Sequence, residues 1–152
     1  MQNIISYSDE LKKYFIDLNI EWLETYFYVE QHDADLLNNC KEVIIDKGGF
    51  IFFYIENEEV LGTFALIKVT ENTFELGKMA VSPKSRGKGI GQKLMVFCVE
   101  FAKSKNWEKL LLYSNTKLEN SIYIYRKFGF VEIPIEENNP YSRGNIKMEL
   151  IL

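Results

Sequence analysis

The chain has 152 residues, of which 47% are hydrophobic and 26% charged, and its formal net charge is −4. These values are ordinary for one folded domain over residues 1–152, and the acidic balance argues against a nucleic-acid-binding protein. Two cysteines do not make a disulfide framework, no apolar run reaches membrane-spanning length, and no secretory signal pattern opens the chain. We therefore expect a cytoplasmic protein that binds neither nucleic acid nor a membrane.

The first third of the chain predicts a strand followed by helices. Residues 3–7 favour a strand, and a helix is expected over about 9–23. Its apolar face would be formed by Leu11, Phe15, Leu18 and Trp22. After the aromatic stretch 24–30, which has no clear assignment, a second helix is expected over 33–39 with Asp33 as its N-cap.

The middle of the chain predicts an antiparallel meander of three strands. Residues 50–55, 60–69 and 74–81 are mainly apolar and are joined by short polar turns. Gly62 lies inside the second of these runs, where a glycine marks a bulge or the close approach of another element.

The last third predicts alternating helices and strands. A helix begins at Ile90, and a strand follows over 109–113. Because a helix separates it from the strand at 74–81, we expect these two strands to be parallel. The remaining elements are a helix over 118–128 closed by Gly129, and strands over 130–135 and 145–152.

A glycine-rich basic loop, residues 82–89, separates the strand at 74–81 from the helix that begins at Ile90. The first turn of a helix presents unpaired N–H groups, and glycines let the backbone approach an anion closely. A Walker A loop and a dinucleotide fingerprint both fail here, because the required spacings of glycine and hydroxyl residues are absent. An ordinary basic turn is the alternative to an anion site.

Three stretches together resemble the GNAT superfamily of N-acetyltransferases. The pattern Arg86-x-x-Gly89-x-Gly91 after a strand is similar to the pyrophosphate loop of that family. Residues 120–130 have the spacing of Asn, Tyr and a Gly-Phe pair that the family often shows, and residues 141–150 look like its closing strand. The resemblance implies an α/β (α+β) GNAT fold. That fold has a mixed, mostly antiparallel central sheet of six to seven strands, flanked by helices, with splayed fourth and fifth strands.

The resemblance also implies acetyl-CoA as cosubstrate, without a metal. The enzyme would transfer the acetyl group to a primary amine of a small molecule or peptide, by direct attack in a ternary complex. The cofactor-binding residues it implies are Met79, Ala80, Val81, Arg86, Gly87, Lys88, Gly89, Ile90, Gly91, Asn115, Asn120 and Tyr123. For the last three, a role as turn or cap residues is the alternative.

Two residues carry the catalytic hypothesis. The resemblance makes Glu75 the general base, and the alternative for Glu75 is an ordinary solvated carboxylate on a strand. The resemblance makes Tyr125 the general acid that protonates the leaving thiolate, and the alternative for Tyr125 is packing in the core. His32 is the only histidine, which excludes a Ser-His-Asp triad and a multi-histidine zinc site.

The acceptor side and the rival functions depend on weaker signals. We expect the acceptor to be bordered by Tyr26, Phe27, Tyr28, Glu30 and Tyr141. The acidic Glu30 and residues 136–137 predict a cationic amine. Two alternatives remain: a non-catalytic CoA-binding sensor or assembly module on the same fold, and an acyl donor other than acetyl-CoA. A homodimer is compatible with either.

Overall fold

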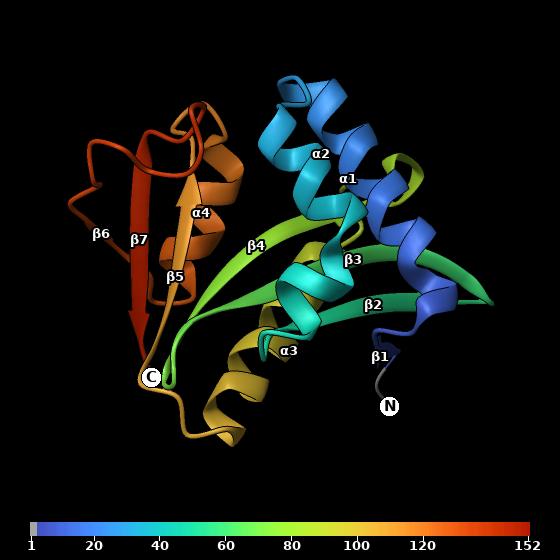
Figure 1. Cartoon of the computed structure of the whole chain (residues 1–152), viewed down its shortest axis with the longest axis horizontal. Helices are drawn as coiled ribbons and strands as arrows, with labels where there is room; N and C mark the ends of the chain where they lie inside the picture. Colours follow the sequence, from blue (N-terminus) through green and yellow to red (C-terminus); the bar gives the residue numbers. More distant parts are fainter. Residues whose placement is uncertain (1–2) are drawn as a thin grey trace.

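A seven-stranded sheet with helices on both faces makes up the computed structural model, which describes residues 3–152 (Figure 1). The strand order is β1-β2-β3-β4-β5-β7-β6. The elements are β1 (Ile4–Ser6), α1 (Lys12–Tyr26), α2 (Gln31–Asn38), β2 (Phe50–Glu56), β3 (Glu59–Thr70), β4 (Thr73–Val81), α3 (Ile90–Ser104), β5 (Lys109–Ser114), α4 (Glu119–Lys127), β6 (Val131–Ile133) and β7 (Ile146–Ile151). Single turns of 3-10 helix at Asp9–Leu11 and Pro83–Ser85, and a π-helical turn at Lys41–Ile45, complete the chain.

The predicted elements are present, with differences at the two N-terminal helices. Helix α1 continues to Tyr26 and so includes the first residues of the stretch that the pattern left unassigned. Helix α2 begins at Gln31, and its N-cap is Glu30, so the prediction of Asp33 as N-cap is wrong. Asp33 is instead the third residue of a capping box, in which its carboxylate accepts the backbone N–H of Glu30 at 3.1 Å.

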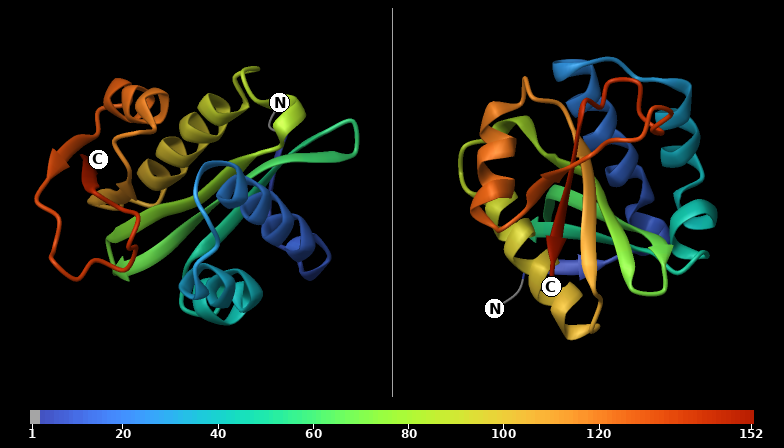
Figure 2. Two further views of the ribbon diagram at one scale, coloured as in Figure 1. Left: turned by 90° about the horizontal axis from the view of Figure 1, so that it is seen from above. Right: turned by 90° about the vertical axis from the view of Figure 1, so that its left-hand side faces the viewer.

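The sheet separates two hydrophobic clusters. Helices α1 and α2 cover one face, and α3 and α4 cover the other (Figure 2). Because successive strand residues point to opposite faces, Phe52 packs with the α3 cluster and Phe53 with the α1 and α2 cluster. On α3 the buried residues follow helical spacing: Ile90, Leu94, Met95, Cys98 and Ala102.

Gly62 allows α3 to approach the sheet backbone closely. A Cβ at Gly62 would lie 3.1 Å from Leu94 Cδ1 and 3.3 Å from Ile90 Cγ2. The pairing of β2 with β3 is also irregular beside this glycine, between Tyr54 and Ile55. The predicted close approach at Gly62 is therefore confirmed.

Strands β4 and β5 are parallel, as predicted, but they pair over only three residues. The last pair is Glu75 with Leu111, whereas β4 continues to Val81 and β5 to Ser114. Just beyond that last pair β4 contains a β-bulge: Ala65 of β3 pairs with Gly77 and Thr63 pairs with Ala80. One residue of β3 thus faces two of β4, which bends the strand and increases its twist. The β4 edge that faces β5 is therefore left unpaired from the bulge onward.

No helix within residues 3–152 is both long and apolar enough to cross a membrane.

Candidate active site

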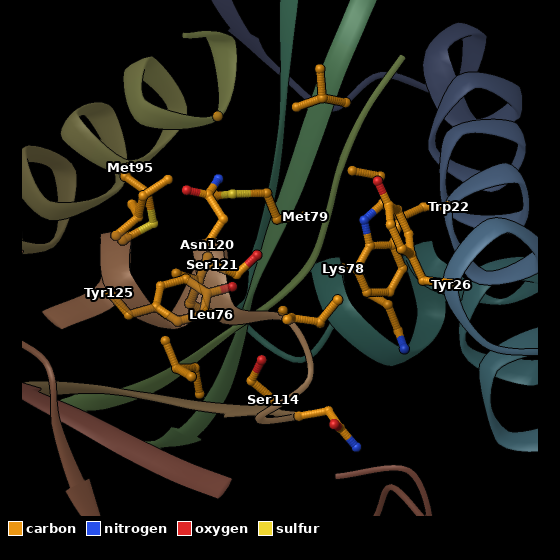
Figure 3. A pocket seen from close by; sticks show the side chains of 18 of the residues that line it. Trp22, Tyr26, Leu76, Lys78, Met79, Met95, Ser114, Asn120, Ser121 and Tyr125 are labelled. Carbon is orange, nitrogen blue, oxygen red and sulfur yellow. The ribbon is translucent and has the colours of Figure 1, made fainter. Parts of the chain in front are cut away.

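A cavity of about 430 Å³ lies where β4 and β5 diverge. Its wall is built by β4 and β5, by the start of α3, by the C-terminal end of α1, by α4 and by the loop between β6 and β7. In the close view Tyr125 and Asn120 enter from one side, Trp22 and Tyr26 from the other, and Met79 lies between them (Figure 3). The divergence therefore creates one continuous site between the two halves of the sheet.

The glycine-rich loop at one end of this cavity has the geometry of an anion cradle. Gly87 and Gly89 have φ of 81° and 82°, which favours glycine, and Gly89 is the N-cap of α3. A Cβ at Gly87, Gly89 or Gly91 would meet no atom within 4 Å. The first turn of α3 holds no acidic residue. Open space over a helix N-terminus fits a pyrophosphate group.

The basic residues of the loop differ in their placement. Arg86 lines the cavity, forms an ion pair with Glu21 of α1, and lies with its guanidinium carbon 5.4 Å from the centre of the Tyr26 ring. Lys88 is exposed and lies outside the cavity lining. Arg86 is thus the loop cation at the cavity, and it also links the loop to α1.

The bulged part of β4 forms the floor of the cavity. Met79, Ala80 and Val81 all line it, and the Ala80 side chain is buried. Lys78 adopts a left-handed φ of 53°, an uncommon conformation for a residue with a side chain. Such strain persists where surrounding contacts hold it, and the contacts of the Lys78 ammonium supply that support.

Glu75 is joined to Tyr141, which the sequence placed only at the border of the acceptor side. The Tyr141 hydroxyl donates to Glu75 Oε2 at 2.7 Å, and both residues line the cavity. Burial raises the pKa of Glu75 above its ordinary value, although the Tyr141 hydrogen bond and Lys78 oppose this. Burial and the neighbouring Glu75 raise the pKa of Tyr141 as well. Glu75 is therefore a half-buried carboxylate with raised proton affinity, which is a property of general bases.

A buried ionic network lies behind the acceptor side of the cavity. Asp33 accepts from Lys78 Nζ at 2.8 Å and from Arg143 Nη1 and Nη2 at 2.7 and 2.8 Å. Arg143 also donates to Glu30 at 2.9 Å. Burial alone would raise the pKa of Asp33, but the hydrogen bonds from Arg143 and the charge of Lys78 outweigh it and hold that pKa below its usual value. The network ties α2, the β4 bulge and the β6–β7 loop together.

Tyr125 presents a free hydroxyl to the cavity from α4. It lines the cavity, its ring lies 6.0 Å from that of Phe130, and nothing within residues 3–152 hydrogen-bonds to its hydroxyl. Burial raises the pKa of Tyr125 to about 12, so the phenol is protonated at neutral pH. Packing against the core thus coexists with an accessible proton donor.

The three polar residues assigned to the cofactor from β5 and α4 have different surroundings. Asn115 lines the cavity, but its amide donates to the Arg143 carbonyl at 2.7 Å and its oxygen accepts the Lys117 N–H at 2.9 Å. Asn120 lines the cavity, whereas Tyr123 is 66% exposed and lies outside the lining. The turn role of Asn115 is therefore present in the structure, and the cofactor roles of all three residues stay predictions.

The predicted negative charge of the acceptor side is wrong for Glu30 and Glu136. Glu30 is paired with Arg143, and Glu136 accepts from Tyr113 and from Lys147 at 3.0 and 3.2 Å. Neither carboxylate lines the cavity. Both pairings join residues far apart in the chain, so the charges cancel in a way that the linear sequence does not indicate.

Other features of the acceptor side have no signal in the linear sequence. Trp22, Lys78 and Arg143 line the cavity, although they were not among the predicted site residues, while the predicted Tyr28 is exposed outside it. Lys117 donates to the Tyr26 carbonyl at 2.8 Å and so links the end of α1 to the β5–α4 loop. Within residues 3–152 no group of three or more His, Cys, Asp or Glu side chains is arranged to hold a metal ion.

The comparison with protein families decides the family. Residues 16–130 match the model of the acetyltransferase (GNAT) family. The chain belongs to the GNAT family. The splayed β4 and β5, the bulge and the glycine loop are therefore parts of a GNAT acetyltransferase fold.

Curated relatives match the chain over about two thirds of its length. N-acetyltransferase 8B of Rattus norvegicus is 26% identical over 102 residues, which are 64% of this chain and 46% of that protein. Mycothiol acetyltransferase of Renibacterium salmoninarum is 23% identical over 103 residues, 64% of this chain and 30% of that protein. The match thus spans a third to a half of these relatives.

Solved structures agree with the fold over almost the whole chain. A GNAT-family acetyltransferase from Staphylococcus aureus has a TM-score of 0.86 at 24% identity and covers 98% of both chains. A Bacillus subtilis acetyltransferase in complex with CoA has a TM-score of 0.76 at 19% identity, covering 100% of this chain and 99% of that one. At these identities the likeness establishes the fold.

The buried network generates a stability prediction. Asp33→Asn should lower the free energy of unfolding at pH 7 by about 3–5 kcal/mol, because it leaves Lys78 and Arg143 buried without their counter-charge. The pKa of Asp33 is depressed in the folded state, so its contribution is present above the unfolded pKa of about 3.9 and is lost as the pH falls below that value.

Urea unfolding at pH 7 and pH 3 measures this effect. The difference between wild type and Asp33→Asn should be smaller at pH 3. Asp35→Asn, two residues along α2 and outside the network, is the matched control and should change stability little. An Asp33→Asn protein as stable as wild type at pH 7 would contradict the role of the network.

Proposed function

We propose that the chain is an acetyl-CoA-dependent N-acetyltransferase that acts on a primary amine of a small molecule or peptide by direct attack in a ternary complex. The observation that supports this most is the placement of three chemical parts in one cavity. They are the open glycine loop at α3, the Glu75–Tyr141 pair on one side and the free Tyr125 hydroxyl on α4.

The residues for holding the cosubstrate fit its shape. Gly87–Gly91, together with Arg86, would bind the pyrophosphate at the N-terminus of α3. The unpaired edge of Met79–Val81 would pair with the amides of the pantetheine arm, as a peptide adds to a sheet edge. When bound, acetyl-CoA supplies an acetyl group activated as a thioester.

The proposed chemistry moves protons at both ends of the reacting group. Glu75 takes a proton from the acceptor ammonium, which frees the amine to attack the carbonyl. A backbone N–H of the β4 bulge stabilises the developing oxyanion. As the C–N bond forms and the C–S bond breaks, Tyr125 would donate its proton to the departing thiolate. The second proton that the attacking nitrogen must lose would pass to the Tyr125 phenolate, which restores the phenol. Burial raises the pKa of Tyr125 to about 12, which keeps the phenol protonated before the reaction.

A thiol-release assay with acetyl-CoA and a broad panel of amines tests the proposal. Steady release of CoA with at least one amine, with a matching acetylated product by mass spectrometry, is the expected result. Tight CoA binding without turnover across the panel would indicate a non-catalytic CoA-binding module instead. Comparing acetyl-CoA with longer thioesters tests the identity of the acyl group.

The loop predicts a binding defect without a folding defect. Gly91→Val should weaken CoA binding at least about a hundredfold, because the added side chain occupies the space where the pyrophosphate would lie. A Cβ at Gly91 would meet no protein atom within 4 Å, and φ at Gly91 is not left-handed, so the melting temperature should change little.

Calorimetric titration with CoA measures this loss. Glu100→Val, on an exposed position of the same helix and outside the cavity, is the matched control and should bind CoA as wild type does. Unchanged CoA affinity in a folded Gly91→Val protein would reject the loop as the binding site.

Removing the Tyr125 hydroxyl should slow the chemical step. Tyr125→Phe keeps the ring and its packing but removes the proton donor, so kcat should fall about 10²-fold or more. CoA affinity should stay close to wild type. Single-turnover kinetics report the chemical step directly, and Tyr14→Phe, on the exposed side of α1, is the control. A wild-type chemical rate in Tyr125→Phe would leave water or the backbone as the proton source.

The role of Glu75 is visible in the pH dependence. Glu75→Gln should depress kcat/KM mainly below the pKa of the acceptor amine, where an ammonium must lose its proton, and the deficit should shrink at higher pH. Burial raises the pKa of Glu75, so the wild-type rate should rise as the pH passes through a value above 4.5. Full pH profiles of both proteins make the comparison, with Glu100→Gln as control. Parallel profiles would exclude Glu75 as the base.

A further inference from the structure

We propose that the amine acceptor is an α-amino acid with an apolar or aromatic side chain, whose free carboxylate is bound by Arg143 and Lys78 while its amine faces Glu75. This inference rests on the proposed acetyl transfer. It concerns the half of the cavity that lies beyond the loop and the β4 edge, and it replaces the cationic acceptor that the sequence indicated.

The charges that face the cavity favour an anionic group. Among the residues of the described chain that line it, four are charged: Glu75, Lys78, Arg86 and Arg143. Arg86 lies at the glycine loop, so one carboxylate and two cations remain on the acceptor side. The counter-charges of these cations, Asp33 and Glu30, do not line the cavity. Both cations therefore belong to residues of the cavity wall, and both of their carboxylate partners lie outside that wall.

Both cations keep hydrogen-bond donors for a ligand. Lysine has three N–H donors and arginine five. Lys78 Nζ donates to Asp33, and Arg143 makes two contacts through Nη1 and one through Nη2. Nε of Arg143 and further N–H groups of both side chains have no acceptor within residues 3–152. A carboxylate matches the fork of an arginine, and such charge-assisted bonds are the strong ones.

Glu75 and the two cations lie around the same ring, that of Tyr141. The Tyr141 ring connects the two groups: its hydroxyl donates to Glu75, its centre lies 5.0 Å from Lys78 Nζ and 5.6 Å from the Arg143 guanidinium carbon. An α-amino acid, whose amine and carboxylate share one carbon, would place both groups around this one ring. A polyamine would instead place its second ammonium against Lys78 and Arg143.

The remaining walls favour an apolar side chain. Trp22, Tyr26 and Phe27 contribute aromatic rings from the end of α1. The ring centre of Trp22 lies 5.2 Å from that of Tyr26 and 5.8 Å from that of Phe27. In the close view Trp22, Tyr26 and Lys78 lie on the same side of the cavity (Figure 3). An aromatic wall beside a cation pair is suited to a side chain and a carboxylate that leave the same carbon atom.

A matched set of acceptors tests the inference on the wild-type protein. The probes are L-phenylalanine, L-phenylalaninamide, phenethylamine and spermidine, which differ in the charge next to the amine. We expect kcat/KM for phenylalanine to exceed that for each of the others at least about tenfold. This factor is the lower end of the effect expected from one charge-assisted hydrogen bond. Equal or better turnover of phenylalaninamide, phenethylamine or spermidine would overturn the inference and leave the acetyltransferase proposal intact.

A variant and a binding measurement complete the test. Arg143→Lys keeps the charge opposite Asp33 but removes the fork, so the ratio of kcat/KM for phenylalanine to that for phenethylamine should fall, and an unchanged ratio would contradict the role of Arg143. If no amine is turned over, the proposed catalysis fails, and calorimetry on the CoA-loaded protein still decides the inference. Tighter binding of phenylalanine than of phenylalaninamide supports it, and equal or weaker binding overturns it.

Discussion

The carboxylate of Asp33 is the group on which the geometry of the cleft depends. It is fully buried, and it holds one cation from the β4 bulge and one from the β6–β7 loop. A buried charge without partners is very costly, so these groups have little freedom to move apart. The pair with Lys78 also supports a left-handed φ of 53° in the middle of a strand. That bulge lies just beyond the last β4–β5 pair, at the point where the two strands separate.

The two halves of the cavity are built by different physical means. The half proposed to hold the cosubstrate consists mainly of backbone: an unpaired strand edge, two glycines with positive φ and the N-terminus of α3. Backbone groups recognise phosphates and amides through shape, so few side chains are needed there. The acceptor half consists of side chains from α1, β4 and the β6–β7 loop. Charge and aromatic area select a ligand there, and these properties can change without changing the fold.

Arg86 and Lys117 connect the halves through α1. Arg86 belongs to the glycine loop and pairs with Glu21, while Lys117 follows β5 and bonds to the last carbonyl of α1. Both contacts hold the end of α1 over the cavity, next to Trp22 and Tyr26. A ligand that competes for Arg86 would therefore act on the same helix that forms the aromatic wall of the acceptor side.

The local sequence pattern was sufficient to predict the order of the elements, the parallel β4–β5 pair, the glycine loop and the close packing at Gly62. Each of these depends on residues close in sequence: alternation for strands, helical spacing for α3, and glycine and proline at the turns. The placement of Glu75, Arg86 and Tyr125 in the site came from the family resemblance, and all three residues line the cavity.

Only the tertiary structure decided which charges meet. The contacts of Asp33 with Lys78, of Tyr141 with Glu75 and of Arg143 with Asp33 span 45, 66 and 110 residues of sequence. Counted along the chain, Glu30 and Glu136 are negative charges near the acceptor, whereas in the fold both are paired with cations and lie outside the cavity wall, which includes Lys78 and Arg143. No local pattern records such pairings, because they arise where helix α2, the β4 bulge and the β6–β7 loop, far apart in sequence, are packed against one another.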